Sequence, residues 1–276
     1  MSVSITSSRL TELTASRRDF LCYSTSVLAF GIPNMAVGSE LDVRQAILED
    51  FGVSYIEAGP VVIDMPDYSD SGKSVPLTLS VPVSLDNQDY PEVIGVYADR
   101  NPRPRIAKVF FSPLCSEAKF STRLRINAYQ NIVAVAKMKS GKLYKASRRV
   151  DVTYGACEEA IANNQFPEGW QPSIKVAVPE AVQANGIIEI RTIIGHPMET
   201  GLRRNASGVI VPVRIVEWFR CYINEKIAFS VNLEPAIAAN PYFSFLVKIA
   251  ESSMIRFEWV DTNGQIYTEE KNIVLA

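Results

Sequence analysis

Four cysteines and one histidine are the side chains of this sequence best suited to nucleophilic, redox or metal chemistry. Cys157 stands out because it follows a strand-like alternation, in the stretch "RVDVTYGACEEA" at 149–160, and lies beside the small residues Gly155 and Ala156. A thiol with small neighbours at the end of a strand can enter the pocket of another protein and react there. The alternative is a linker cysteine without a chemical role, and spacing alone does not decide between the two.

The other cysteines and the histidine have simpler interpretations. Cys221 lies in the apolar stretch "EWFRCYINE" and is expected to be a small buried residue. Cys115 follows a predicted strand, and a disulfide from it to Cys157 or Cys221 stays open. His196 is expected to be hydrogen-bonded in a turn at a strand end. Because the sequence has no His and Cys cluster, nucleophile elbow or glycine-rich phosphate loop, we expect no metal, no cofactor and no catalysis by the chain's own side chains.

The composition is that of a soluble globular protein. The chain has 276 residues, of which 47% are apolar and 21% charged, so it can form one large domain or two of ordinary size. A net charge of −2 does not suggest a nucleic-acid partner. Since no long uncharged apolar run follows the N-terminal region, we expect no membrane span in the mature chain.

Residues 1–38 have the order of a bacterial export signal. The pair Arg17-Arg18 precedes an apolar run, and small residues lie just before a cleavage point at Ser39. The twin arginines indicate the twin-arginine (Tat) route and hence a periplasmic protein. The alternative is an amphipathic helix with two surface arginines. Cleavage would remove Cys22 and leave three cysteines, so at least one thiol would be free or would pair outside the chain.

A short amphipathic helix is expected at the start of the mature chain. Ser39 would cap its first turn together with Asp42, and Gly52 would end it. The residues expected in its buried stripe are Leu41, Ile47, Leu48 and Phe51.

After this helix, short strands with turn residues between them predict an all-β fold of two β-sandwich domains in tandem. We place the first domain at 39–157, a linker at 158–173 and the second domain at 174–276. Trp170 in the linker is expected to dock against one of the domains. The expected strands are 61–65, 75–85, 92–99, 107–112, 120–127, a hairpin over 132–154, 174–179, 187–195, 209–223, 226–233, 242–250, 254–262 and 265–275.

Turns and side-chain directions follow from the same patterns. Ser140-Gly141 and Asn263-Gly264 are expected hairpin turns, because glycine accepts a positive φ. In the strand 120–127, period-two alternation places Arg123 and Arg125 on the outward face.

Long motifs in both halves resemble known families. The first half contains "SVPLTLSVPV", "VYADRNPRPRIAKVFFSP", "STRLRI" and "NIVAVAKMKSGKLYKASRRVDVTYGAC", and the second contains "IIEIRTIIGHPMETGLRR" and "NLEPAIAANPYFSFLVKIAESSMIRFEWVDTNGQIYTEEKNIVL". The first set resembles SoxY, the periplasmic sulfur carrier of bacterial thiosulfate oxidation, and the second resembles its partner SoxZ. The whole is similar to the fused SoxYZ-like carriers associated with quinoprotein dehydrogenases. The resemblance implies two immunoglobulin-like sandwiches that pair within the chain.

The resemblance also implies a site. SoxY ends in a glycine-rich arm whose cysteine carries sulfur intermediates between enzymes, and Cys157 is the matching position. Gly155, Ala156, Glu158 and Glu159 flank it, so three of the four arm glycines are replaced, and the two carboxylates disfavour a thiolate. The implied partners are periplasmic redox enzymes, either of the Sox type or quinoprotein dehydrogenase and cytochrome systems.

Three hypotheses follow. The first is a covalent sulfur carrier that is not itself an enzyme and uses Cys157. The second is a non-catalytic binding or assembly module for a periplasmic quinoprotein dehydrogenase, in which the thiol is incidental. The third, a thiol-dependent sulfurtransferase, is disfavoured by the missing catalytic partners.

Overall fold

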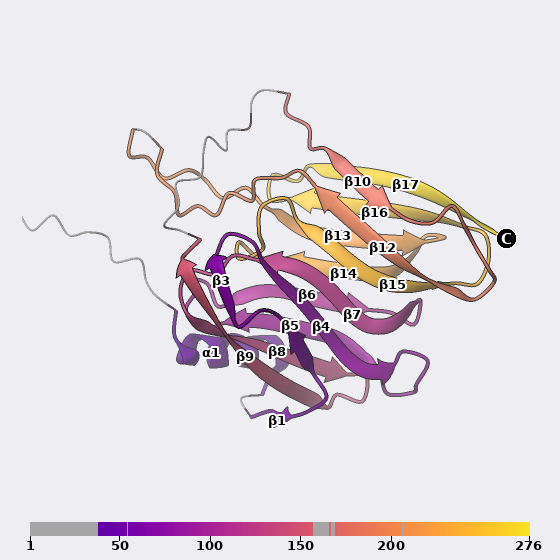
Figure 1. Cartoon of the computed structure of the whole chain (residues 1–276), viewed down its shortest axis with the longest axis horizontal. Coiled ribbons are helices and arrows are strands. Elements are labelled where there is room, and N and C mark those ends of the chain that lie inside the picture. The colour runs from indigo at the N-terminus through magenta and orange to yellow at the C-terminus, as the bar shows by residue number, and fades with distance from the viewer. Residues whose placement is uncertain (1–37, 54, 157–165, 167–168, 206) are drawn as a thin grey trace, which may run out of the picture. The chain divides into compact units, whose positions relative to one another are not determined.

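The computed structural model describes residues 38–53, 55–156, 166, 169–205 and 207–276, and the described part is one α-helix, α1 (Glu40–Phe51), and seventeen strands (Figure 1). The predicted all-β fold, with two β-sandwich domains in tandem, is confirmed. The strands are Glu57–Ala58 (β1), Val62–Asp64 (β2), Tyr68–Ser71 (β3), Val75–Ser84 (β4), Pro91–Ala98 (β5), Arg105–Phe111 (β6), Cys115–Leu124 (β7), Gln130–Met138 (β8), Leu143–Tyr154 (β9), Ile174–Ala177 (β10), Ala181–Val182 (β11), Gly186–Ile194 (β12), Val216–Ile223 (β13), Lys226–Leu233 (β14), Tyr242–Ile249 (β15), Ser253–Asp261 (β16) and Ile266–Leu275 (β17).

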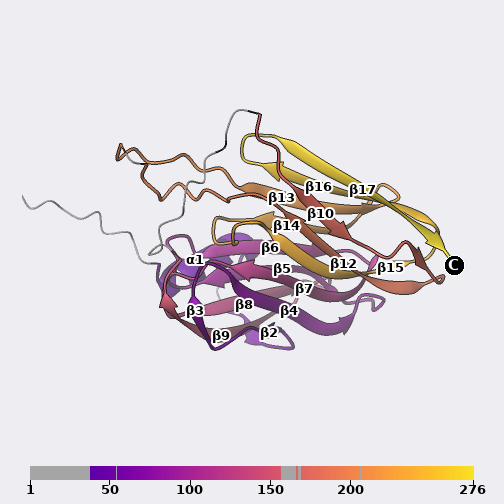
Figure 2. The ribbon, with the colours of Figure 1, turned by 45° about the horizontal axis from the view of Figure 1, so that its top comes forward.

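The two halves share their sheets. One sheet has the order β1-β9-β8-β5-β6-β14-β13-β16-β17-β11, with β3 also paired to β9, and the other has the order β10-β12-β15-β7-β4-β2 (Figures 1 and 2). The halves meet where β6 pairs antiparallel with β14 and β7 pairs antiparallel with β15. Backbone hydrogen bonds therefore join first-half strands to second-half strands in both layers, which the strand pattern of the sequence did not predict.

An aromatic core lies between the layers where the halves meet. Phe229 of β14 stacks on Phe245 of β15 with ring centroids 4.1 Å apart. Phe120 of β7 packs against both Phe229 and Phe243 at 5.7 Å. All four rings are buried. Because this core takes rings from both halves, we expect the halves to unfold together.

The predicted helix forms with the predicted caps. Ser39 and Asp42 form a capping box, and Gly52 ends the helix in the left-handed conformation with φ +75°. The predicted buried stripe is wrong in two positions, since Leu41 and Leu48 are 73% and 40% exposed. Ile47 is buried as predicted, together with Val43 and Ala46, and the three pack with Tyr97 and Val135.

Asp50 explains which face of the helix turns inward. It follows Val43, Ala46 and Ile47 at helical spacing, and its carboxylate lies 2.6 Å from Lys108 Nζ and 3.1 Å from Arg105 Nε. Burial by itself would raise the pKa of Asp50, but the hydrogen bonds from Lys108, Tyr97 and Arg105 outweigh it and hold the pKa below its ordinary value. Lys108 and Arg105 belong to β6, so their ion pairs with Asp50 fix which face of α1 packs on the sheet.

One predicted strand is shorter in the structure than expected. The stretch 209–223 is not one strand: only Val216–Ile223 joins the sheet, and the residues before it return along 199–205 in a separate hairpin. Cys115 follows β6, as expected, and is itself the first residue of β7. The turns at Gly141 and Gly264 form as expected, with φ +87° and +75°.

We predict that Phe229→Ala destabilises both halves at once. Removing a buried phenylalanine from a packed core costs about 3–5 kcal/mol. Urea unfolding followed by circular dichroism and by tryptophan fluorescence should show one shared transition, shifted to lower urea. Ile227→Ala is the matched control, because Ile227 lies on the same strand but is 48% exposed; it should change stability by less than about 1 kcal/mol. Two separated transitions would contradict the shared core.

Candidate functional site

Cys157, Glu158 and Glu159 lie outside the described residues, so the site is built from the residues on either side of them. On the N-terminal side the chain is described up to Ala156. On the C-terminal side it is described at Phe166 and again from Gly169. The contacts of these flanking residues define how the structure holds the segment that contains Cys157.

The N-terminal flank is held between two neighbouring backbone segments. β9 ends beside β3 in a parallel pairing of Tyr154 with Ser71, and Gly72 N–H donates to the Tyr154 carbonyl at 2.7 Å. On the other side, Ala156 N–H donates to the Ile126 carbonyl at 2.9 Å. Ala156 is buried, so the chain is fixed up to the residue before Cys157.

Gly155 allows this close packing. A Cβ atom at Gly155 would lie 2.0 Å from the Asn127 carbonyl oxygen, which no side chain tolerates without a backbone shift. Gly72 is under the same constraint, with a Cβ position 1.9 Å from the Ile126 oxygen. At position 155 glycine therefore serves the close approach of two backbone segments.

An aromatic cluster holds the C-terminal flank. Phe166 and Trp170 pack edge to face at 4.9 Å, and both contact the His196 ring, at 5.3 and 5.6 Å. The Arg214 guanidinium lies 3.8 Å from the centre of the Phe166 ring. Trp170 also contacts Tyr267 of β17. The prediction that Trp170 docks against a domain is confirmed, and the domain is the second one.

Arg125 connects the two flanks. Its guanidinium donates to the carbonyls of Met198, at 2.6 Å, and Pro197, at 2.8 Å. Its neighbour Ile126 accepts the hydrogen bond from Ala156. The alternation placed Arg125 on the outward face, but carbonyls of the second half meet it there, so it is half-buried rather than fully exposed. No local signal in the sequence identifies Arg125, Phe166 or Arg214 as parts of this site, because each acts through residues that are distant in the chain.

His196 is a buried, neutral turn residue, as expected. Its Nδ1 accepts a hydrogen bond from Met198 N–H at 3.0 Å, and its carbonyl accepts from Asn240 N–H. Burial lowers the pKa of His196 to about 4; Asp261 opposes this shift, and the charges of Arg214 and Arg125 add to it. A neutral imidazole packed against two aromatic rings supports the turn and is not placed as a general base.

The two described cysteines are unreactive. Cys115 and Cys221 are buried and free, so neither pairs with the other. Burial raises the pKa of Cys115 to about 12 and raises that of Cys221 well above its ordinary value. Because the thiolate is the reactive form of cysteine, neither side chain can act as a nucleophile near neutral pH.

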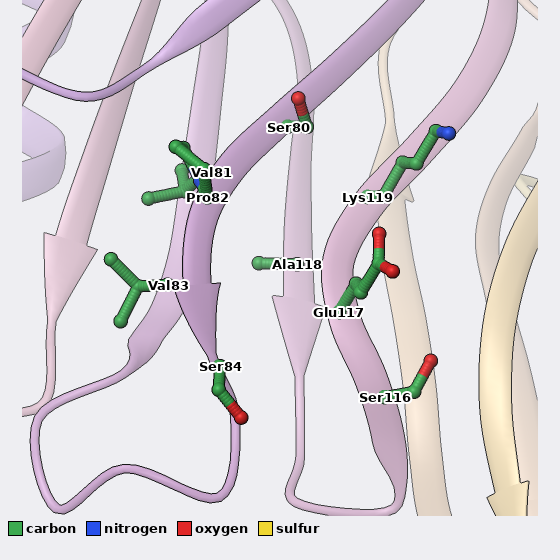
Figure 3. Close-up of a pocket in the computed structure, with 9 residues that line it drawn as sticks. All are labelled: Ser80, Val81, Pro82, Val83, Ser84, Ser116, Glu117, Ala118 and Lys119. Carbon is green, nitrogen blue, oxygen red and sulfur yellow. The ribbon is translucent and has the colours of Figure 1, made fainter. Parts of the chain in front are cut away.

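A separate hollow of about 540 Å³ lies between β4 and β7, where the β4 register shifts between Val81 and Ser84 (Figure 3). It is lined by Ser80–Ser84 and Ser116–Lys119 and includes none of the predicted site residues. Over the part of the chain that the structure describes, no three acidic, histidine or cysteine side chains gather in a way that could hold a metal ion. The described helix is too short and too polar to cross a membrane.

Comparison with known proteins assigns a family to each half. Residues 47–157 match the model of the sulfur oxidation protein SoxY, and residues 174–272 match that of the sulphur oxidation protein SoxZ. No curated protein sequence matches the chain.

Solved structures also overlap the chain in part. The sulfur carrier protein SoxY from Chlorobium limicola f thiosulfatophilum is 28% identical over 42% of this chain and 99% of its own, with a TM-score of 0.36. A superoxide reductase (neelaredoxin) from Ignicoccus hospitalis is 20% identical over 38% of this chain and 80% of its own, with a TM-score of 0.29. The family matches, and not these partial superpositions, carry the assignment.

We predict that Gly155→Ala loosens the N-terminal flank. The added methyl group would force Gly155 away from Asn127, at a cost of about 1–3 kcal/mol in the free energy of unfolding. Urea denaturation measures that loss, and hydrogen exchange should show faster exchange at the Ala156 amide. Ser147→Ala, at an exposed position of the same strand, is the control and should leave both quantities unchanged. Unchanged protection of Ala156 in Gly155→Ala would contradict the close packing.

A pH dependence follows from His196. Its pKa is about 4 in the folded protein against an ordinary value of 6.5, so between these values the unfolded chain binds the proton more readily. The stabilisation from the neutral imidazole is complete above pH 6.5 and is lost as the pH falls toward 4. The expected loss is about 3 kcal/mol.

His196→Gln tests this dependence, because glutamine does not titrate and offers an oxygen that can accept from Met198 N–H. The free energy of unfolding should fall more steeply between pH 6.5 and 4 in the native protein than in His196→Gln, since all other titrating groups are common to both. The chain has one histidine, so an NMR titration reads its pKa directly. An imidazole that titrates near 6.5 would refute this account.

Proposed function

We propose that this chain, which carries a SoxY domain followed by a SoxZ domain and so belongs to the sulfur-oxidation carrier family, holds sulfur intermediates covalently on the Cys157 thiol and presents them to partner enzymes. We place this activity in the periplasm, after Tat export and cleavage before Ser39. The carrier itself performs no catalysis in this proposal. The export signal and Cys157 are inferred from the sequence, since both lie outside the described residues.

The observation that carries the proposal is the burial of the other two thiols. After the proposed cleavage the chain keeps three cysteines, and Cys115 and Cys221 are both buried with a raised pKa. A covalent carrier needs a thiolate that a partner enzyme can reach. Cys157 directly follows Ala156, at the boundary between the halves, and is the remaining candidate.

The chemistry of loading requires a redox partner. Joining the Cys157 thiol to the outer sulfur of thiosulfate forms one S–S bond, releases one proton and removes two electrons. The described residues include no group that accepts these electrons, so an enzyme of the Sox type, or a dehydrogenase and cytochrome system, must take them. Release follows when another nucleophile attacks the sulfur chain and regenerates the thiolate.

The SoxZ domain gives the carrier its second anchor. Phe166 and Trp170 hold the C-terminal flank on the second half, while Gly155 and Ala156 hold the N-terminal flank on the first. The two halves are paired within one chain through both sheets. A partner enzyme would therefore meet Cys157 within a segment held at both ends, not on a free terminus.

This anchoring also favours a second candidate function. Because Gly155 and Ala156 are packed, only the Cys157 residue itself separates the thiol from the fixed chain on that side. A short reach limits entry into a deep pocket. In this alternative the chain is a non-catalytic binding or assembly module for a periplasmic quinoprotein dehydrogenase, and the thiol is incidental.

Intact mass spectrometry separates the two functions. We expect the exported protein to begin at Ser39 and to gain a thiosulfate-derived adduct when incubated with thiosulfate and a periplasmic extract of the cell that makes it. Peptide mapping should place the adduct on Cys157, and Cys157→Ser should carry none. Cys115→Ala is the matched control and should load like the native protein, because Cys115 is buried. An adduct that persists in Cys157→Ser, or no adduct on the native protein, would refute the carrier function.

A further inference from the structure

The stretch between β12 and β13 contains a hairpin that lies outside both sheets. We call residues 199–205 and 207–214 the basic hairpin. Its two arms pair through bridges between Glu199 and Arg214 and between Arg204 and Ile210. In both views it extends beyond the sheets, at the end where β9 terminates (Figures 1 and 2). A segment that leaves the core needs its own source of rigidity.

The turn at the tip supplies part of that rigidity. Asn205 Oδ1 accepts from the backbone N–H groups of Ser207, at 3.0 Å, and Val209, at 2.9 Å. Asn205 N–H donates to the Val209 carbonyl, and Gly208 adopts φ +78°, which glycine tolerates without strain. The tip is therefore a hydrogen-bonded turn with a defined shape.

Ion pairs anchor the root of the basic hairpin. The buried Glu199 carboxylate receives two hydrogen bonds from Arg203, at 2.8 and 3.0 Å. On the return arm, Arg214 lies 3.3 Å from the buried Asp261 carboxylate. Both hydrogen bonds from Arg203 go to the same oxygen, Glu199 Oε2, and charge-assisted contacts to a buried carboxylate are stronger than neutral ones. The hairpin is thus a stiff projection on a buried foundation.

The basic hairpin exposes apolar side chains next to an exposed arginine. Leu202, Val209 and Ile210 are 41%, 60% and 51% exposed. Of its three arginines, Arg203 pairs with Glu199 and Arg214 pairs with Asp261, so Arg204 is the exposed cation left for a partner, in a chain whose net charge is −2. Apolar side chains next to guanidinium groups are typical of surfaces that bind another protein.

The basic hairpin begins next to the flanks of the Cys157 segment. Its first residue, Glu199, follows Met198 and Pro197, whose carbonyls accept from Arg125. Its last residue, Arg214, lies over the Phe166 ring. The same contacts that hold both flanks of the segment therefore also hold the root of the hairpin.

We propose that the basic hairpin is the docking element for the enzyme that loads the carrier, and that this enzyme offers an apolar depression bordered by carboxylates. The proposal rests on the proposed carrier function. Leu202 and Ile210 would enter the depression, and Arg204 would pair with the carboxylates. Charge complementarity favours this occupant, because the hairpin is positive while the remainder of the chain is negative and would repel an acidic enzyme. Because the root of the hairpin contacts both flanks of the segment, an enzyme docked on the hairpin would be held near Cys157.

Loading of the purified full chain by two routes tests the proposal. In the first, thiosulfate and a periplasmic extract of the same cell supply the loading enzyme. In the second, polysulfide alone supplies sulfur: the thiolate attacks a polysulfide S–S bond, forms a persulfide and expels a polysulfide one sulfur shorter. We compare the native protein with the double variant Leu202→Glu/Ile210→Glu and with Arg204→Glu. Ile187→Glu is the matched control, since Ile187 is 57% exposed on β12.

We expect extract-dependent loading to slow at least tenfold in the double variant and severalfold in Arg204→Glu, and to stay unchanged in Ile187→Glu. Polysulfide loading should be equal in all of them. Added salt should slow extract-dependent loading of the native protein more than that of Arg204→Glu. Thermal melting checks that each variant is folded. If the double variant does not fold, the comparison is made with Arg204→Glu alone, because Arg204 is exposed.

Three results would overturn the proposal. If the folded hairpin variants load with the extract as fast as the native protein, the hairpin is not the docking element, and the carrier function still stands. No loading of the native protein by either route removes the carrier function, and the docking role with it. If the double variant sediments more slowly than the native protein, the hairpin instead binds a second copy of the chain. If the native protein floats with anionic vesicles and the double variant does not, the hairpin instead binds a lipid surface.

Discussion

The antiparallel pairing of β6 with β14 and of β7 with β15 is the constraint on which the rest of the structure depends. These two pairings continue the backbone hydrogen bonds of each half into the other, so neither half has a free sheet edge where they meet. They also bring Phe120 of the first half onto Phe229 and Phe243 of the second. Linking both halves in one chain raises their effective concentration and favours this intrachain pairing.

The shared sheets determine how the segment around Cys157 is held. Its N-terminal flank hydrogen-bonds to Ile126 in the first half, and its C-terminal flank packs on His196 in the second. Arg125 joins the two by donating to carbonyls beside His196. The described residues on both sides of this segment are therefore anchored, one flank on each half of the chain.

The same core separates inert thiols from the candidate carrier. Cys115 and Cys221 lie among apolar side chains, where forming a thiolate would leave a charge without solvation. Their burial keeps both thiols protonated and out of reach of solvent. The basic hairpin shows the opposite arrangement: its ion pairs lie at the root, while Leu202, Ile210 and Arg204 are exposed. Sequence composition alone does not separate these two environments.

Local signals were sufficient for much of this structure. Ser39 and Gly52 bound the helix, Gly141 and Gly264 mark two turns, and the long motifs of each half identify the family, because these features depend on a few adjacent residues. Tertiary contacts decided the rest. Asp50 turned the helix away from the face of Leu41 and Leu48. The second half covered part of Arg125. Residues 209–215, expected in a strand over 209–223, lie outside the sheet. In the folded chain the backbone of Asn127 lies close against Gly155. The small-residue stretch around Gly155 does not reveal this contact. In each case the deciding partner lies far away in the chain, and a pattern of neighbouring residues does not encode which distant group will approach.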